Sequence, residues 1–329
     1  YPAKYGTDTI EMHFKNTKAD AVWSFIDCFI FDKDVCSRIP WMAWVPADSE
    51  PVMRNNIEPL KACRWRAALT KWGQRQVERV GMECGYIPCS FSAEQYFPGD
   101  KAAAKASLSR LFKRDLTGNK IVNVVSANTG SRKNFPGIFK AWSHVQEEVP
   151  EAVLYIHADP TGYFTSGENM EPVMDLYKID RDRVIFAPVW QYVGGMIGPD
   201  YLRTVYQASD LHLNACFGEG FGIPILESMA CGVPCVVPDF GGAGELMEDD
   251  AGLVVGGERV VTVPGAEQFL PDPHELALCM ISILVGDILF YPGSVTHAAE
   301  PYEAGRVFEE HVVPMLERME RELKCSPAS

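Results

Sequence analysis

Strand-like and helix-like segments alternate through the middle of this 329-residue chain, and no other feature restricts its fold as strongly. Short apolar runs rich in β-branched residues are separated by longer amphipathic stretches that are typical of helices. The predicted strands cover residues 121–126, 153–157, 184–188, 211–215 and 233–237. Repeated βα units of this kind form a parallel sheet with helices on both faces. The sequence therefore predicts an α/β fold with a doubly wound sheet.

The first 100 residues show a weaker version of the same pattern. Two aromatic-rich runs of strand length, 21–26 and 41–46, are followed by the polar residues Asp27 and Asp48. Ligands of open α/β sheets bind beyond the carboxyl ends of the strands, so both aspartates fall where ligand-facing loops are expected. Residues 60–81 are predicted to form one basic, amphipathic helix.

Composition and charge argue against several classes of protein. The net charge of −14 disfavours broad binding to nucleic acid, whose phosphates call for a basic face. No apolar run reaches the roughly 18–20 residues that span a bilayer. Many of the ten cysteines lie in apolar segments, and none has the C-x-x-C spacing of a zinc site. We therefore expect a reduced, cytoplasmic protein, with a structural disulfide as the alternative.

The segment 219–234 predicts a site for a phosphorylated ligand. It follows the predicted strand 211–215 and opens a helix. Glycines at this junction let the backbone approach a ligand, and the amides of the first helical turn favour an anion. Glu219 and Glu227 stand on either side of the turn. Carboxylates are poor phosphate ligands but good acceptors for sugar hydroxyls, so the combination indicates a nucleotide-sugar.

This segment reads E-G-F-G-x-P-x-x-E-x-M-A-x-G-x-P and resembles the signature of the retaining glycosyltransferases of family 4. The resemblance extends from about residue 121 to the C-terminus and is weaker upstream. It implies the GT-B fold, in which two Rossmann-like, doubly wound domains face each other. The glycine-rich strand–loop–helix that opens the first domain in this family is not found here. We therefore expect the N-terminal domain to be incomplete, through trimming of the chain or a naturally reduced front half.

The resemblance implies three parts. We expect residues 1–100 to form a partial, acceptor-side Rossmann-like domain and residues 101–303 to form the nucleotide-sugar-binding domain. Residues 304–329 are expected to form a C-terminal helix that crosses back to the first domain, as it does in GT-B enzymes.

The resemblance also implies roles for individual residues on the donor side. Arg132 and Lys133 would bind the donor's phosphates and stabilise charge on the leaving nucleotide, although the family commonly separates the two basic residues by several positions. Glu219 would contact the transferred sugar, and Glu227, in the first helical turn, would hold the ribose. The structural alternatives are a solvated basic loop and ordinary acids at a helix start. The other expected donor contacts are Gly220, Phe221, Gly222, Ile223 and Asn128.

The nucleobase and the acceptor are assigned by the same resemblance. Pro188 and the loop to Tyr192 occupy the place where the family's nucleobase lies. Trp190 or Tyr192 would stack on the base, with a place in the core as the equal alternative. Asp48 is expected on the acceptor side, although many relatives have a histidine in this loop and this chain has none there.

The resemblance thus implies a retaining, metal-independent hexosyltransferase that uses a UDP- or GDP-sugar as substrate and needs no cofactor. The acceptor would be a glycan, a lipid or another hydroxyl compound, and peripheral contact with a membrane stays open. A degenerate GT-B protein that binds a nucleotide-sugar or glycan without turnover is the main alternative. A remote alternative is an Fe(II)/2-oxoglutarate oxygenase, whose two-histidine, one-carboxylate site would use His157, Asp159 and His297.

Overall fold

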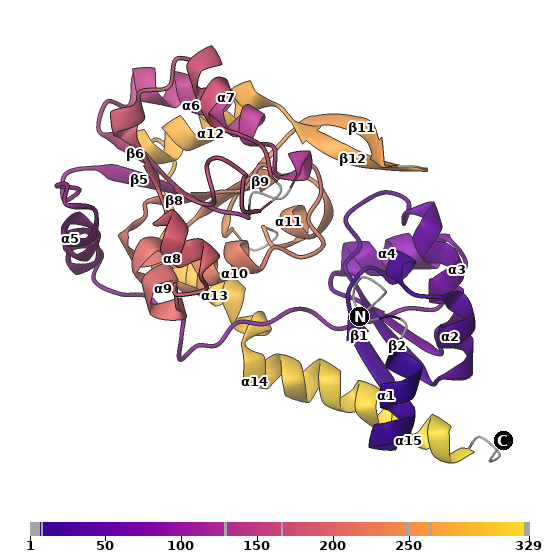
Figure 1. Cartoon of the computed structure of the whole chain (residues 1–329). Helices are drawn as coiled ribbons and strands as arrows, with labels where there is room; N and C mark the ends of the chain where they lie inside the picture. Colours follow the sequence, from indigo (N-terminus) through magenta and orange to yellow (C-terminus); the bar gives the residue numbers. More distant parts are fainter. Residues whose placement is uncertain are drawn as a thin grey trace.

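The structure is a computed structural model that describes residues 7, 9–127, 130–165, 167–247, 250–263 and 265–325. Two parallel sheets organise the chain (Figure 1). Residues 9–89, built on a four-stranded sheet, are called the front unit below. Residues 101–299, built on a six-stranded sheet, are called the rear unit.

The front unit has a parallel sheet in the strand order β1-β2-β3-β4. The predicted single helix over residues 60–81 is wrong, because a strand interrupts it. Trp65 and Ala67 of that strand are buried inside the sheet, and such an inner strand has no helical period. The strands are β1 (Val22–Phe25), β2 (Trp41–Val45), β3 (Trp65–Ala68) and β4 (Gly85–Tyr86), and the helices are α1 (Ile10–Thr17), α2 (Lys33–Arg38), α3 (Arg54–Ala62) and α4 (Lys71–Arg79).

The rear unit has a parallel sheet in the order β10-β9-β8-β5-β6-β7, as the βα alternation predicts. Its strands are β5 (Lys120–Val125), β6 (Ala152–His157), β7 (Val184–Phe186), β8 (Leu211–Leu213), β9 (Cys235–Pro238) and β10 (Gly252–Val255). Its helices are α5 (Lys101–Phe112), α6 (Phe135–Glu148), α7 (Glu171–Leu176), α8 (Val189–Val193), α9 (Pro199–Ala208), α10 (Ile223–Ala230), α11 (Gly241–Glu245), α12 (Pro273–Val285) and α13 (Pro292–Ala299).

Helices bury both faces of the rear sheet. Val122 and Val124 of β5 belong to the same core cluster as Trp142 of α6 and Met280 of α12. Val125, on the opposite face, belongs to a second cluster that includes residues of α10 and α13. Burial on both faces is the usual condition of parallel strands and accounts for their continuous apolar runs. In the part of the chain that the structure describes, no helix is long and apolar enough to cross a membrane.

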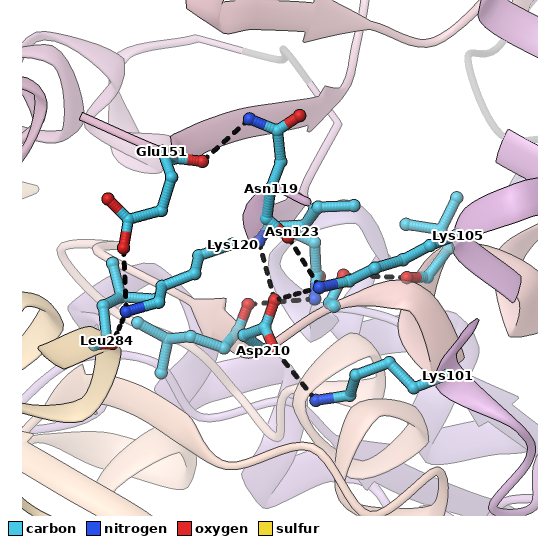
Figure 2. Close-up of polar contacts among 12 residues, drawn as sticks. Lys101, Lys105, Asn119, Lys120, Asn123, Glu151, Asp210 and Leu284 are labelled. Carbon is cyan, nitrogen blue, oxygen red and sulfur yellow. Dashed lines mark hydrogen bonds and ion pairs between the residues drawn. The ribbon is translucent and has the colours of Figure 1, made fainter. Parts of the chain in front are cut away.

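A polar network fixes the amino-terminal ends of β5 and β8, away from the edge where ligands of such sheets bind (Figure 2). The carboxylate of Asp210 lies 3.0 Å from the ammonium groups of both Lys101 and Lys105 on α5. It also accepts the backbone N–H of Ile121 at 2.8 Å. Lys105 is largely buried and donates a further bond to the Asn119 carbonyl at 2.6 Å. Asp210 therefore holds α5 against the sheet.

The C-terminal helical segment joins the rear unit to the front unit (Figure 1). It consists of α14 (Ala304–Val307), the π-helical turn Phe308–Val312 and α15 (Val313–Cys325). Met315 and Met319 pack in one apolar cluster with residues of the front sheet, including Trp65. The indole N–H of Trp65 donates to the Glu322 carboxylate at 2.8 Å. The domain boundaries predicted at residues 100 and 303 stay predictions.

An antiparallel hairpin that the sequence pattern did not predict forms a second connection. Its strands are β11 (Gly257–Val263) and β12 (Ala266–Pro271). The Glu267 backbone exchanges two hydrogen bonds, of 2.9 and 2.8 Å, with the Glu50 backbone in the loop after β2. The Glu50 carboxylate accepts hydrogen bonds from Arg79 of the front unit and Arg259 of the hairpin. The hairpin thus holds the front loop that carries Asp48.

Asp210→Ala should lower the free energy of unfolding by about 2–4 kcal/mol, because it leaves the Lys105 ammonium and the Ile121 N–H without this partner. Urea denaturation measures the change. Asp175→Ala is the matched control: Asp175 also pairs with a cation, Arg181 at 2.8 Å, but its side chain is 77% exposed, so a loss below about 1 kcal/mol is expected. Equal losses for the two variants would contradict a structural role for Asp210.

Candidate functional site

The candidate site lies at the carboxyl-terminal edge of the rear sheet, between β5 and β8. These strands are neighbours, although β6 and β7 separate them in the sequence. The chain leaves β5 toward β6 on one side and leaves β8 toward β9 on the other. Because these two connections run to opposite sides, they leave a crevice between β5 and β8 at this edge. Open α/β sheets bind ligands in such a crevice. The loop after β5 carries Arg132 and Lys133, and the loop after β8 carries Glu219.

Three predicted site residues meet in this crevice. The Lys133 ammonium lies 2.9 Å from Oε2 of Glu219. A guanidinium nitrogen of Arg132 lies 3.8 Å from Oε2 of Glu219 and 3.9 Å from Oδ2 of Asp48. Arg132 also donates to the Gly218 carbonyl. The structure therefore brings together the predicted donor residues Arg132, Lys133 and Glu219, and adds the predicted acceptor-side residue Asp48 from the front unit.

Burial and charge act against each other at these groups. Burial alone would raise the pKa of the Glu219 carboxyl, but the positive charges of Lys133 and Arg132 outweigh it and hold the pKa below its ordinary value. Burial alone would lower the pKa of Lys133, but neighbouring Cys216 and Glu219 outweigh it and raise the pKa. Both residues are thus charged at neutral pH. A buried ion pair of this kind needs each partner, since removing one leaves the other uncompensated.

A cavity of about 280 Å³ lies between the two units at this point. The rear unit contributes the charged loop and the start of α10, and the front unit contributes the ends of its strands. The described lining residues are Phe25, Asp27, Pro46, Asp48, Leu69, Cys89, Arg132, Glu219, Gly220, Phe221, Gly222, Ile223 and Pro224. The predicted donor contacts Gly220, Phe221, Gly222 and Ile223 therefore all face this cavity.

Glycine is required where the rear loop approaches the front unit. A Cβ on Gly218 would lie 2.1 Å from the carbonyl oxygen of Asp48, a distance that no side chain tolerates. Gly222, the N-cap of α10, has φ of +103°, which is strained for residues with side chains. No side chain caps α10. Because Gly222 supplies no side-chain cap, the first-turn amides other than Pro224, which has no N–H, suit an anionic ligand.

Glu227 lies apart from the residues that line the cavity. It is in the second turn of α10, not the first turn that the sequence predicted. Its carboxylate accepts a hydrogen bond from the Tyr206 hydroxyl at 2.9 Å. Burial raises the pKa of Glu227, while bonds from Tyr206 and Tyr96 partly oppose the rise. Its predicted contact with ribose stays a prediction.

The predicted nucleobase region is also outside the lining of the cavity. Pro188 precedes α8, and the ring of Tyr192 lies edge-on to His157 with a centroid separation of 5.1 Å. Trp190 is 72% exposed and contacts Phe164, so it is not a core residue. Asn128 lies outside the described residues.

Two residues beyond the predicted set shape this region. Asp27, just after the carboxyl end of β1, lines the cavity beside Asp48. Its position after a predicted strand was the sequence feature that indicated a ligand-facing residue. Glu245 of α11 accepts the backbone N–H groups of Lys71 and Trp72, at 2.9 and 2.6 Å, and so caps α4 of the front unit. No sequence pattern reveals a cap supplied from 173 residues away.

The iron site of the oxygenase alternative is not assembled. Nδ1 of His157 shares a hydrogen bond of 2.8 Å with the Tyr155 hydroxyl, and burial lowers the pKa of His157 to about 4. His297 is exposed on α13 and pairs with Glu300 at 3.0 Å. Among the described residues, no group of three His, Cys, Asp or Glu side chains is placed to hold a metal ion.

Comparison with known sequences identifies relatives of the rear unit. The sequence model of the family "Glycosyl transferases group 1" matches residues 119–283, half of the 329-residue chain. The D-inositol 3-phosphate glycosyltransferase of Rhodococcus jostii (strain RHA1) is 28% identical over 187 residues, which are 56% of this chain and 38% of that protein. The O-antigen chain mannosyltransferase B of Escherichia coli is 40% identical over 65 residues, 20% of this chain and 17% of that protein. The chain thus matches less than half the length of these relatives.

Comparison with solved structures confirms the predicted GT-B fold. The sucrose-phosphate synthase of Thermosynechococcus elongatus superposes with a TM-score of 0.69 at 18% identity, covering 97% of this chain and 78% of that chain. HepE of Anabaena, in complex with UDP and glucose, superposes with a TM-score of 0.67 at 15% identity, covering 94% of this chain and 80% of that chain.

Asp48→Asn should stabilise the protein above about pH 6 by about 1–3 kcal/mol. Burial raises the pKa of Asp48 to about 6, with Arg132 opposing the rise in part. Because the folded pKa exceeds the unfolded one, the wild type loses stability relative to the variant as pH rises from about 4 through about 6. Urea denaturation across this range measures the difference. A stability difference between Asp48→Asn and the wild type that stays flat across this range would contradict a raised pKa of Asp48.

Proposed function

The chain belongs to the family of glycosyl transferases group 1, and we propose that it moves a hexose from a UDP- or GDP-sugar to an acceptor hydroxyl with retention of configuration. The proposal includes membership of glycosyltransferase family 4. The E-x7-E motif of that family would then be Glu219 and Glu227.

The observation that carries the proposal is the cationic pair beside an uncapped helix start. Lys133 and Arg132 lie at the crevice with the glycine-containing turn that opens α10. A diphosphate in this crevice would meet an ammonium, a planar guanidinium and backbone amides at once. In the absence of donor, Glu219 neutralises Lys133 at 2.9 Å. A bound diphosphate would replace Glu219 as the partner of the Lys133 ammonium. The Glu219 carboxylate could then accept a hydrogen bond from a sugar hydroxyl.

The remaining donor contacts follow from this placement. Amides of Gly220, Phe221, Gly222 and Ile223 would bind the phosphates. Glu227 would accept ribose hydroxyls in exchange for its bond from Tyr206, which is 2.9 Å long without ligand. Pro188, Tyr192 and Asn128 would lie nearer the base. Tyr192 stands at the carboxyl end of β7, two strands from β5 on the rear sheet, so the nucleotide would extend along this edge.

The proposed reaction needs no side chain as a base. The bond between the anomeric carbon and the β-phosphate oxygen breaks while the acceptor oxygen bonds to the same carbon from the same face. The acceptor's proton passes to the departing phosphate oxygen. Arg132 and Lys133 stabilise the charge that develops on the diphosphate, which is the role a metal ion has in other transferases. Most of the acceleration would come from positioning and electrostatic stabilisation.

The complex of HepE with UDP and glucose supports a UDP-sugar donor ahead of a GDP-sugar. The partners would be this donor and a hydroxyl acceptor, without nucleic acid. We place the reaction in the cytoplasm, with peripheral membrane contact if the acceptor is a lipid.

Lys133→Ala should lower sugar transfer by roughly 10²–10³-fold, because it removes charge stabilisation from the leaving diphosphate. Donor turnover, followed by nucleoside diphosphate release from UDP-glucose or GDP-mannose, measures the loss. Lys140→Ala, an exposed lysine on α6, is the control and should keep wild-type turnover.

A thermal-shift series with the same donors accompanies this assay. A donor at 100 times its Kd should stabilise the wild type by about 2.7 kcal/mol. Stabilisation without turnover would support the degenerate binding protein instead. Wild-type turnover by Lys133→Ala would contradict the phosphate role.

A further inference from the structure

The front wall of the cavity contains groups that the proposed donor site does not use. Phe25 is the last residue of β1, Asp27 lies two residues later, and Asp48 comes from the loop after β2. All three face the 280 Å³ cavity on the side opposite Glu219 and the start of α10. The family match begins at residue 119, so it says nothing about this wall.

Asp27 is held in a fixed orientation with one oxygen unused. The buried Asn56 side chain bonds to the Asp27 carboxylate and accepts the Phe29 N–H at 2.7 Å through its own Oδ1. Oδ1 of Asp27 is buried and has no hydrogen-bond partner among the described residues. A buried oxygen without a partner destabilises the fold, and because Asp27 lines the cavity, its carboxylate suits a ligand that donates a hydrogen bond.

Phe25 adds an apolar surface to the same wall. Its ring is 51% exposed and lies 4.7 Å from the ring of Trp44, at a tilt of 37°. Trp44 is fixed in turn, because its indole N–H donates to the Ile87 carbonyl at 2.7 Å. An exposed aromatic face held by a second ring suits the C–H-rich face of a sugar or cyclitol ring.

The charges of the cavity decide which acceptor fits. Among the described lining residues, Arg132 is the basic one, and Asp48 and Glu219 lie within 4.0 Å of it. Asp27 and Asp48 are close enough for their charges to act on each other, which contributes to the raised pKa of Asp48 after burial itself. A phosphate or carboxylate on the acceptor would therefore be repelled by the carboxylates of Asp27 and Asp48. Arg132 already lies beside Asp48 and Glu219, so it is not free to compensate this charge.

We propose that Phe25, Asp27 and Asp48 form an acceptor subsite for an uncharged sugar or cyclic polyol, held by two hydroxyls. One hydroxyl would donate to Asp27 and the other to Asp48, while the ring packs on Phe25. The subsite rests on the proposed transferase activity and names its acceptor class. Asp27 binds and orients the acceptor; the proton of the reacting hydroxyl still goes to the leaving phosphate oxygen.

The first test compares acceptors with the wild-type enzyme. UDP-glucose and GDP-mannose serve as donors, with neutral methyl glycosides and myo-inositol against the corresponding sugar phosphates and uronic acids. Transfer to a neutral compound at a rate at least about 10-fold above its anionic counterpart is expected, since 1.4 kcal/mol corresponds to that ratio. Preference for the anionic compounds, or donor hydrolysis without transfer to any neutral compound, would overturn the subsite.

The second test uses variants of the wall. Asp27→Asn and Phe25→Ala should each raise the KM of the neutral acceptor about 10-fold and lower the ratio of transfer to donor hydrolysis. Phe25 is half-exposed, so Phe25→Ala should fold even if Asp27→Asn folds poorly. The subsite can then still be tested with Phe25→Ala. Exposed Asp34→Asn is the matched control. Wild-type KM in both wall variants would refute the subsite, whereas a wild type that neither binds nor hydrolyses a donor would refute the transferase function itself.

Discussion

The ion pair between Lys133 and Glu219 is the interaction on which the site depends. The strand order places β5 beside β8, so loops distant in the sequence put opposite charges 2.9 Å apart in a largely buried crevice. Arg132 extends the pair to Asp48 across the gap between the units. Lys133 and Glu219 compensate each other without ligand, whereas Arg132 offsets the burial of Asp48 only in part, so an anion that competes for the cations can enter this network.

The cavity exists because several contacts hold the front unit against the rear unit. The β11–β12 hairpin pairs with the backbone of Glu50, two residues after Asp48. Glu245 caps α4, and the C-terminal helix packs Met315 and Met319 on the front sheet. These contacts surround the site without contributing reacting groups. The hairpin contact fixes the loop that carries Asp48.

The sequence predicted the parts of this fold that depend on local patterns. The rear βα alternation and the turn at Glu219 carry their own signals, so the parallel sheet and the ligand-facing turn were predicted. The adjacency of β5 and β8, which pairs Lys133 with Glu219, was not. Contacts made at a distance had no such signal. Strand β3 was hidden in a helix-like composition, and the Glu245 cap joins two units. The hairpin stands outside the regular βα alternation, although Pro264-Gly265 is a turn signal in the sequence. The bond between Tyr206 and Glu227 likewise appears only after α9 and α10 pack.

The most direct measurement is a crystal structure with a nucleotide-sugar such as UDP-glucose bound. We expect the diphosphate in the crevice between β5 and β8, on the amides that open α10, with Lys133 turned from Glu219 to a phosphate oxygen. Glu219 should then contact the sugar. A nucleotide bound elsewhere, with the Lys133–Glu219 pair intact and the crevice closed by side chains, would contradict the account.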